Sequence, residues 1–454
     1  MSKNIMKFVS MAVAFLMILS LAACGSGNST TTGTTAAAEK SAAANTDATT
    51  KAAETKASEP MTITLKTHYN NDNEKAPVDF AISQLKNDFP NVTVQPEGYD
   101  TDQSVMKARI ASGDLPEIFE VDSSNIDLAI KSNSIIPLDD YAAKYGIMDI
   151  LSSAVANTLK YKDGKIWAIP VYGPMYHTMF YNKDLFDSNG IKVPANFNEL
   201  LDAAKAFKAK GIIPIAVSGK TAWAIGSLFD IFAQRINPKG WLALEDGSAK
   251  AADFKDAISK IETAVKAGVF MKGAATMDYD PSRAPFHAGK AAMLLVGEWE
   301  VSEGQKDLGD KLQYMTQFPT MDAGADYANP GVMPGGTLLD SFALSSKIKN
   351  PDYVVEVFSK YYKYFQEAQF QKQQVIWSTI KTDGLTPEKP FPALVTKYIA
   401  EKGKLIPGGN TWLGYSPNQK FDTGFTEEMQ KLLVGEKTDD FIKNIDKLQA
   451  ASKQ

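Results

Sequence analysis

Residues 162–186 read KDGKIWAIPVYGPMYHTMFYNKDLF, and this stretch joins two strand-like runs through an unusual step. Asp163-Gly164 is a strong signal for a tight turn. The apolar run IWAIPVY follows, Gly173-Pro174 interrupts it, and MYHTMFYN resumes strand character before a helix opens near Asp184. A Gly-Pro step between two strands fits a hinge, and it fits a β-bulge or bend inside one sheet equally well.

Composition excludes several classes of function. The chain has 454 residues, 44% of them hydrophobic and 22% charged, so we expect a globular protein of about two to three domains. The net charge of −5 gives no basic excess for nucleic acid. One cysteine cannot form a disulfide framework or a cysteine zinc site, and the three histidines lack ligand spacing. We therefore expect no metal and no cofactor.

The N-terminus has the pattern of an export signal. Lys3 and Lys7 precede an uncharged apolar stretch at residues 8–23, which is short for a membrane-spanning helix. A short membrane-anchor helix is the alternative. The run LAAC ending at Cys24 resembles the lipobox of bacterial lipoproteins, which implies a signal peptide at 1–23 and lipid attachment at Cys24.

The segment after this cysteine predicts a tether. Residues 25–60 contain no Val, Ile, Leu, Met or aromatic residue, so they cannot bury enough apolar surface to offset the entropy of ordering. We expect residues 24–60, the lipidated cysteine and its tether, to be disordered, with a reach of ~30–35 Å.

Strands and helices alternate in the remaining chain. Strand-like runs at 62–67, 91–99 and 115–122 are separated by a helix with Pro77 in its first turn and by a helix capped by Thr101. The same order restarts later, where Asn196 and Glu199 form a capping box and Asn350-Pro351 opens a long helix. Two α/β lobes in series, each with a parallel sheet, explain this order best.

Three segments together resemble one family. They are GKIWAIPVY…MFYNKDLFDSNGIKVPANFNELLDAAKAFKAKGIIPIAV, FHAGKAAMLLVGEW and SKIKNPDYVVEVFSKYY…EAQF. These segments resemble the family 1 extracellular solute-binding proteins, and the resemblance spans about residues 61–454. His287 and Thr337 depart from the family pattern.

The resemblance implies a two-lobed, periplasmic-binding-protein-like α/β fold with a hinged interlobe cleft. It implies a monomeric receptor and not an enzyme. The receptor would bind a carbohydrate, with an oligosaccharide as the first expectation, and deliver it to the permease of an ABC importer. With the lipobox, we expect it on the outer face of the cell membrane, as in Gram-positive members.

The resemblance also favours the hinge at Gly173-Pro174. We expect the first lobe to end in the hairpin at Asp163-Gly164, with IWAIP crossing over. Later crossings should fall near residues 333–336 and 390–395. The predicted boundaries are 61–170 plus 337–392 for lobe 1 and 171–336 plus 393–454 for lobe 2.

Ligands of open α/β sheets bind beyond the carboxyl ends of the strands. The loops expected there offer aromatic rings for the apolar face of a sugar, and carboxylates and amides for its hydroxyl groups. We predict a ligand site formed by His68, Asn70, Asn71, Asp122, Tyr172, Trp223, Glu298, Trp299, Gly335, Gly336 and Trp412.

Several of these residues also have a structural interpretation. Trp223 and Trp412 are equally compatible with a core position. We interpret His68 and His177 as structural histidines with satisfied hydrogen bonds, in preference to ligand contacts. We interpret the aromatic run at 361–365 as core packing.

Two other functions stay open. Glu298 and Glu300 in GEWE are candidates for the acid and the nucleophile of an exported glycoside hydrolase. The ligand of a binding protein could also be a peptide, a polyamine or an opine, and several acids beside aromatic rings would favour a polyamine.

Overall fold

The computed structural model describes residues 59–100, 103–327, 329, 331–337, 340–402, 406–407 and 411–452. The predicted signal peptide, Cys24, most of the predicted tether and the capping residue Thr101 lie outside the described residues. Within the described ranges, no helix combines the length and the apolar character that a membrane span requires.

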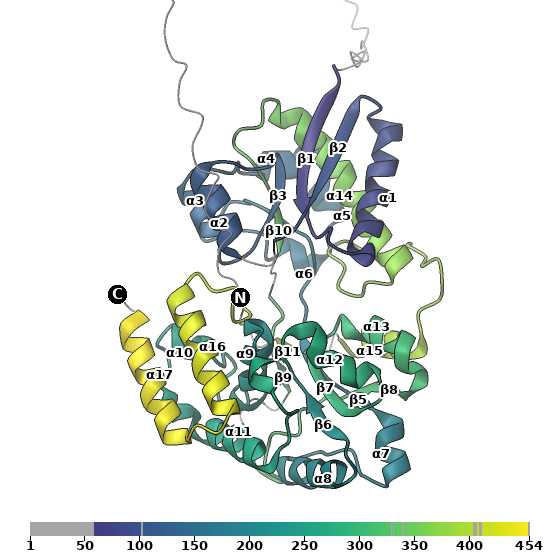
Figure 1. Cartoon of the computed structure of the whole chain (residues 1–454). Coiled ribbons are helices and arrows are strands. Elements are labelled where there is room, and N and C mark those ends of the chain that lie inside the picture. Colours follow the sequence, from purple (N-terminus) through teal and green to yellow (C-terminus); the bar gives the residue numbers. More distant parts are fainter. Residues whose placement is uncertain are drawn as a thin grey trace, which may run out of the picture. The chain divides into compact units, whose positions relative to one another are not determined.

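The first sheet is built mainly from the N-terminal part of the body (Figure 1). Its strand order is β2 (Val92–Gly98), β1 (Met61–Thr67), β3 (Ile118–Val121), β10 (Ser341–Leu344) and β4 (Ile169–Pro170). The helices of this part are α1 (Asp72–Asp88), α2 (Gln103–Ser112), α3 (Ile126–Lys131), α4 (Asp139–Lys144), α5 (Ile147–Ile150), α6 (Ser153–Ala156) and α14 (Pro351–Gln373). Helices α1 and α14 pack against each other, as Figure 1 shows.

The second sheet has the order β6 (Ile213–Ala216), β7 (Ala291–Gly297), β5 (His177–Asn182) and β8 (Leu312–Tyr314). Its helices are α7 (Lys183–Asn189), α8 (Phe197–Ala209), α9 (Ala222–Ala233), α10 (Leu242–Glu245), α11 (Lys255–Ala267), α12 (Tyr279–His287), α13 (Glu300–Leu308), α15 (Ala393–Lys402), α16 (Gln419–Leu433) and α17 (Thr438–Ser452). Short 3₁₀ turns lie at Ala251–Phe254, Ala274–Thr276 and Gly309–Lys311, and β9 (Val332–Met333) pairs with β11 (Ile406–Pro407).

Each sheet has its own hydrophobic core. One core joins apolar residues of β1, β4, β10, α1 and α14, and the other joins residues of β5, β6, β7, α9, α11 and α16. Tyr361, Tyr362 and Phe365 are buried in the first core, which confirms that this aromatic run is packing. The two sheets confirm the predicted α/β fold class with two lobes. The predicted lobe boundaries stay a prediction.

Both sheets are mixed, and the prediction of parallel sheets is wrong. Strands β1, β2 and β3 are parallel, but β10 is antiparallel to β3. Strands β6 and β7 are parallel, but β5 is antiparallel to β7. Strands β5 and β10 each begin at the edge where the parallel strands of their sheet end, because His177 is paired with Gly297 and Ser341 with Val121.

The quoted stretch 162–186 behaves partly as predicted. The turn at Asp163-Gly164 forms, with a hydrogen bond of 2.8 Å from Tyr161 N to Lys165 O. IWAIP does not cross over, however, because β4 is hydrogen-bonded to β10 in the first sheet. The chain passes to the second sheet only between Pro170 and His177, and this interval contains the Gly-Pro step.

Pro77 lies inside helix α1, not in its first turn, which corrects the predicted helix start. Asn71 caps the helix by accepting a hydrogen bond from Glu74 N, and the helix begins at Asp72. Pro77 has no N–H for the carbonyl of Asn73. The side chain of Gln373 on α14 donates to that carbonyl instead, so the packing of the two helices compensates for the proline.

Candidate functional site

Loops of the second sheet converge at one edge, which we call the second-sheet edge. The carboxyl ends of β6 and β7 and the first residue of β5 lie there, since His177 is paired with Gly297. The chain continues from β7 into Trp299 and from β6 through a turn into Trp223 on α9. Sheet topology therefore brings these aromatic residues together.

Four rings at this edge contact one another, and we call His177, Trp223, Trp299 and Trp412 the tryptophan cluster. His177 stacks on Trp223 with ring centroids 5.4 Å apart, and its centroid lies 4.6 Å from that of Trp412. Trp299 lies 5.3 Å from Trp412 and 5.4 Å from Trp223. The structure thus brings together the three predicted tryptophans, and Trp223 and Trp299 keep part of their surface exposed.

Two glycines allow this close packing. A Cβ atom at Gly297 would lie 1.8 Å from the ring of Trp299. Gly335 has φ +96, and its Cβ atom would lie 2.5 Å from the carbonyl oxygen of Met175 and 2.7 Å from Trp412 Nε1. Only glycine adopts such a conformation at low cost. The predicted Gly335-Gly336 step therefore supports the cluster, and Gly336 N donates to Met175 O at 2.8 Å.

His177 is the polar centre of the cluster. Its Nδ1 lies 2.6 Å from Ser227 Oγ, and that hydroxyl donates to the carbonyl of Trp223 at 2.8 Å. Because the hydroxyl proton is used there, Nδ1–H must be the donor, which leaves Nε2 as an acceptor. Burial lowers the pKa of His177 to about 3, so the ring is neutral.

The interpretation of His177 as a satisfied histidine is wrong at one atom. Its Nε2 is buried and has no hydrogen-bond partner among the described residues. The same holds for Trp412 Nε1, and Trp412 is only 6% exposed. The buried, unpaired acceptor and donor are an incomplete polar arrangement that a ligand could complete.

The first sheet has a matching edge, the first-sheet edge, formed by the carboxyl ends of β1, β3 and β4 and the start of β10. His68 follows β1, and its Nδ1 lies 2.6 Å from Glu120 Oε2 on β3. Burial disfavours the charged imidazole, but the Glu120 carboxylate outweighs this effect and raises the pKa of His68 to about 9. His68 also stacks on Tyr99 and meets Tyr172 edge-on, at 4.4 and 5.7 Å between centroids.

Two carboxylates at the first-sheet edge carry unpaired oxygens. Asp122 Oδ1 accepts from the backbone N–H groups of Ser124 and Asn125 and from the Ser124 hydroxyl, but Oδ2 has no partner among the described residues. Asp340 Oδ1, just before β10, is likewise buried without a described partner. Burial raises the pKa of both carboxyl groups.

Contacts connect the two edges. The Ser123 hydroxyl, beside Asp122, donates to Tyr415 O at 2.5 Å and lies 3.2 Å from Thr411 Oγ1. The segment that contains Trp412 therefore touches the turn after β3. Trp412 and Met175 also form a small apolar cluster against Tyr172, Trp377 and Tyr415, so residues from both edges share one neighbourhood.

Three predicted residues have other partners. Asn71 caps α1, and Asn70 is exposed and donates to Tyr99 O at 2.9 Å. Glu298 is fully buried and accepts from the Tyr398 hydroxyl at 2.8 Å. As ligand contacts these three residues stay predictions, with less support than the tryptophans.

Glu300, the second candidate of a hydrolase pair, is also fully buried. It lies 3.0 Å from Arg283 Nη1 and 2.7 Å from His287 Nε2. Neither Glu298 nor Glu300 presents a free, exposed carboxylate in the described structure, so this geometry gives the hydrolase interpretation no support. The ion pairs also give His287 a structural role where it departs from the family pattern.

Prediction from the sequence gave His177 a structural role and did not name Asp340, Trp377 or Tyr415. His177 and Asp340 stand at the beginning of strands that are antiparallel to their neighbours. The sequence did contain a signal for these positions. A strand that follows a predicted crossing must begin at the sheet edge where the other strands end, so the residues at its start are candidates for the site.

A family model described as bacterial extracellular solute-binding protein matches residues 71–368. The chain belongs to this family. The family match covers strands and helices of both sheets.

Two curated relatives and one solved structure illustrate the similarity. A probable sugar-binding periplasmic protein of Brucella suis is 28% identical over 207 residues, which is 44% of this chain and 48% of the relative. The match thus spans about half the length of that relative. The multiple sugar-binding protein of Streptococcus mutans is 22% identical over 365 residues, 77% of this chain and 82% of the relative.

The solved structure comes from work on xylan utilisation by Caldanaerobius polysaccharolyticus. It has a TM-score of 0.74 at 24% identity and covers 86% of this solute-binding protein and all of its own chain. At this identity the similarity concerns the fold.

Proposed function

We propose that this solute-binding protein is the receptor of an ABC importer, that it captures a carbohydrate by closure of two lobes, and that it performs no chemistry on it. The tryptophan cluster carries this proposal. Rings at the second-sheet edge offer apolar faces for a sugar, and Asp122 and Asp340 at the first-sheet edge offer free acceptors for its hydroxyl groups. The names of the two relatives, both sugar-binding proteins, support the carbohydrate class.

The wider biological setting is part of the same proposal. The LAAC motif supports lipid attachment at Cys24 and an extracytoplasmic position, with residues 25–60 as the tether. A receptor of this kind passes its ligand to a membrane permease that recognises the closed form. We propose a monomer, with the hinge in the interval that contains Gly173-Pro174 and the lobe boundaries given by the sequence.

The experiment is a thermal-shift screen of the purified full chain against a panel of glycans, followed by calorimetry and product analysis. A ligand that binds only the folded state raises the melting temperature with its concentration. We expect a saturable shift with one group of carbohydrates and no product. Turnover of a glycan would replace the binding proposal with the hydrolase, and no shift with any carbohydrate would contradict the sugar class.

One observation favours a second ligand class. Asp122 and Asp340 are buried carboxyl groups at the first-sheet edge, and the rings of Tyr99 and Tyr172 pack against His68, which is paired with the buried Glu120. Several acids among aromatic rings suit a solute with an amino group, such as a polyamine or an amino sugar. Spermidine and glucosamine oligosaccharides therefore belong in the panel. A shift with spermidine alone would favour a polyamine over a carbohydrate.

A further inference from the structure

Helices α12 and α13 carry complementary charges at helical spacing. On α12, the residues Tyr279, Arg283 and His287 follow one another at intervals of four, so they share one face of the helix. On α13, acidic residues recur at intervals of three and four, namely Glu300, Glu303 and Asp307. Ion pairs join the two sets of side chains.

Glu300 is the centre of these ion pairs. It is fully buried and lies 3.0 Å from Arg283 Nη1 and 2.7 Å from His287 Nε2. Arg283 Nη1 is also 2.6 Å from Glu303 Oε2, and His287 Nδ1 is 2.7 Å from Asp307 Oδ2. A buried carboxylate needs such partners, because its removal from water is costly. The network therefore fixes the guanidinium group of Arg283.

Arg283 connects the network to an aromatic ring. Its guanidinium carbon lies 4.8 Å from the centroid of the Tyr279 ring, which is a cation–π contact. The planar guanidinium stacks on a ring in a defined orientation, as a lysine ammonium group does not. Tyr279 is half-buried and also meets Trp223 edge-on, with centroids 5.1 Å apart. These contacts restrict the position of the Tyr279 ring.

The Tyr279 hydroxyl in turn contacts the tryptophan cluster. Trp299 Nε1 donates a hydrogen bond of 2.6 Å to this hydroxyl. Trp299 lies in the short turn between β7 and α13, and its ring is only partly buried. A partly exposed side chain can change rotamer, and a hydrogen bond at Nε1 fixes one edge of the indole. The face that Trp299 presents to a solute therefore depends on Tyr279.

We propose that Tyr279 is a positioning residue of the ligand site, which holds Trp299 in the orientation that binds the solute. Arg283, fixed by Glu300 and Glu303, holds Tyr279 in place and acts without touching the solute. This inference rests on the proposed function and extends it to residues behind the tryptophan cluster. A role in stability alone would leave binding independent of the hydrogen bond between Trp299 and Tyr279.

The test is a double-mutant cycle between Tyr279→Phe and Trp299→Phe in the full chain, measured by calorimetry. The probe is the xylo-, malto-, laminari- or chito-oligosaccharide that the wild-type chain binds most tightly. Tyr279→Phe keeps the ring and loses the hydroxyl, so it should weaken binding about three- to tenfold. Trp299→Phe keeps a ring but has no N–H, so in this background Tyr279→Phe should change the affinity by less than about twofold.

Near-UV circular dichroism of the free protein is a second readout, because it reports the packing of aromatic rings. Tyr279→Phe should change the tryptophan bands. Arg283→Lys should change them in the same direction, since lysine keeps the charge but loses the planar group over the ring. The matched control is Tyr364→Phe on α14, which removes a tyrosine hydroxyl that is hydrogen-bonded to Asp88 at 2.7 Å. The control should change neither the affinity nor the tryptophan bands.

Three outcomes would overturn parts of this inference and leave the proposed function intact. Unchanged affinity in Tyr279→Phe would remove its positioning role. An equal loss in both backgrounds would also remove it, because Tyr279 would then act independently of the Trp299 N–H. Unchanged tryptophan bands in Arg283→Lys would remove the role of Arg283. If the wild-type chain binds no carbohydrate at all, both the inference and the proposed function are overturned.

Discussion

Asp122→Asn separates binding from folding more cleanly than other substitutions at the site. Asp122 Oδ1 accepts from Ser124 N at 2.7 Å, from Ser124 Oγ at 2.6 Å and from Asn125 N at 3.1 Å. The amide oxygen of asparagine can keep these three hydrogen bonds. The amide nitrogen then replaces the unpaired Oδ2, so a donor faces the ligand where an acceptor stood.

The expected magnitude follows from this exchange. A hydrogen bond to a charged group contributes ~1.5–3 kcal/mol, so the dissociation constant should rise by about 10- to 150-fold. Burial raises the pKa of Asp122, which means that the ionised form is unfavourable in the folded protein. A neutral amide removes this cost at neutral pH, so the melting temperature should stay constant or rise.

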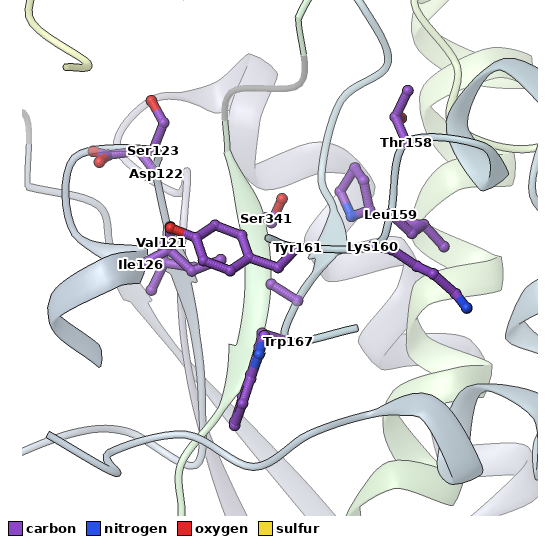
Figure 2. Close-up of a pocket in the computed structure, with 12 residues that line it drawn as sticks. Val121, Asp122, Ser123, Ile126, Thr158, Leu159, Lys160, Tyr161, Trp167 and Ser341 are labelled. Carbon is purple, nitrogen blue, oxygen red and sulfur yellow. The ribbon is translucent and has the colours of Figure 1, made fainter. Parts of the chain in front are cut away.

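Isothermal titration calorimetry gives the affinity, and differential scanning calorimetry gives the melting temperature. Asp139→Asn is the matched control, because Asp139, the first residue of α4, accepts from Ile166 N through Oδ2 at 3.0 Å and does not line the pocket that Asp122 lines (Figure 2). The control should bind ligand like the wild type. Unchanged affinity in Asp122→Asn would show that Oδ2 accepts nothing from the ligand, and a drop in melting temperature would refute the argument about the retained hydrogen bonds.

Three more variants test other parts of the site. Trp299→Ala should weaken ligand binding at least about tenfold in calorimetry while circular dichroism stays native, and unchanged affinity would remove Trp299 from the site. His68→Gln should lower the free energy of unfolding by up to about 3 kcal/mol near pH 6.5, because the folded pKa of about 9 exceeds the ordinary 6.5. This difference should vanish in urea titrations as the pH rises through about 9, and a pH-independent difference would contradict the Glu120 pairing. Gly335→Ala should lower the melting temperature and cost ~1–3 kcal/mol, since it combines a positive φ with a clash at Met175 O; wild-type stability would show that the backbone relaxes there.

Local sequence patterns were reliable where a single element decides the outcome. Asn350 caps α14, Asn196 caps α8, and Gly164 forms the tight turn, because capping and turn geometry depend only on residues a few positions apart. Pro77 is the exception. Its tolerance inside α1 depends on Gln373, which is distant in sequence, so no local rule could place it.

The predicted site shows the same limit. The rule that ligands lie beyond the carboxyl ends of strands correctly grouped Trp223 with Trp299, and Asp122 with His68, near one edge each. It left His177 as a structural residue and did not include Asp340, because the rule assumes parallel strands, whereas His177 begins an antiparallel strand and Asp340 directly precedes one.

The sequence by itself determined an α/β chain of two lobes, the order of strands and helices, and the residue types suited to bind a sugar. The fold class and the element order follow from periodicity, caps and turns, which act over a few residues, whereas the sugar class came from the resemblance to the solute-binding family. Only the tertiary structure decided which side chains keep unpaired polar atoms and which, like Glu298, find a partner such as Tyr398 far along the chain. The physical reason is that hydrogen-bond satisfaction in a buried site depends on neighbours that folding, not the sequence order, brings together.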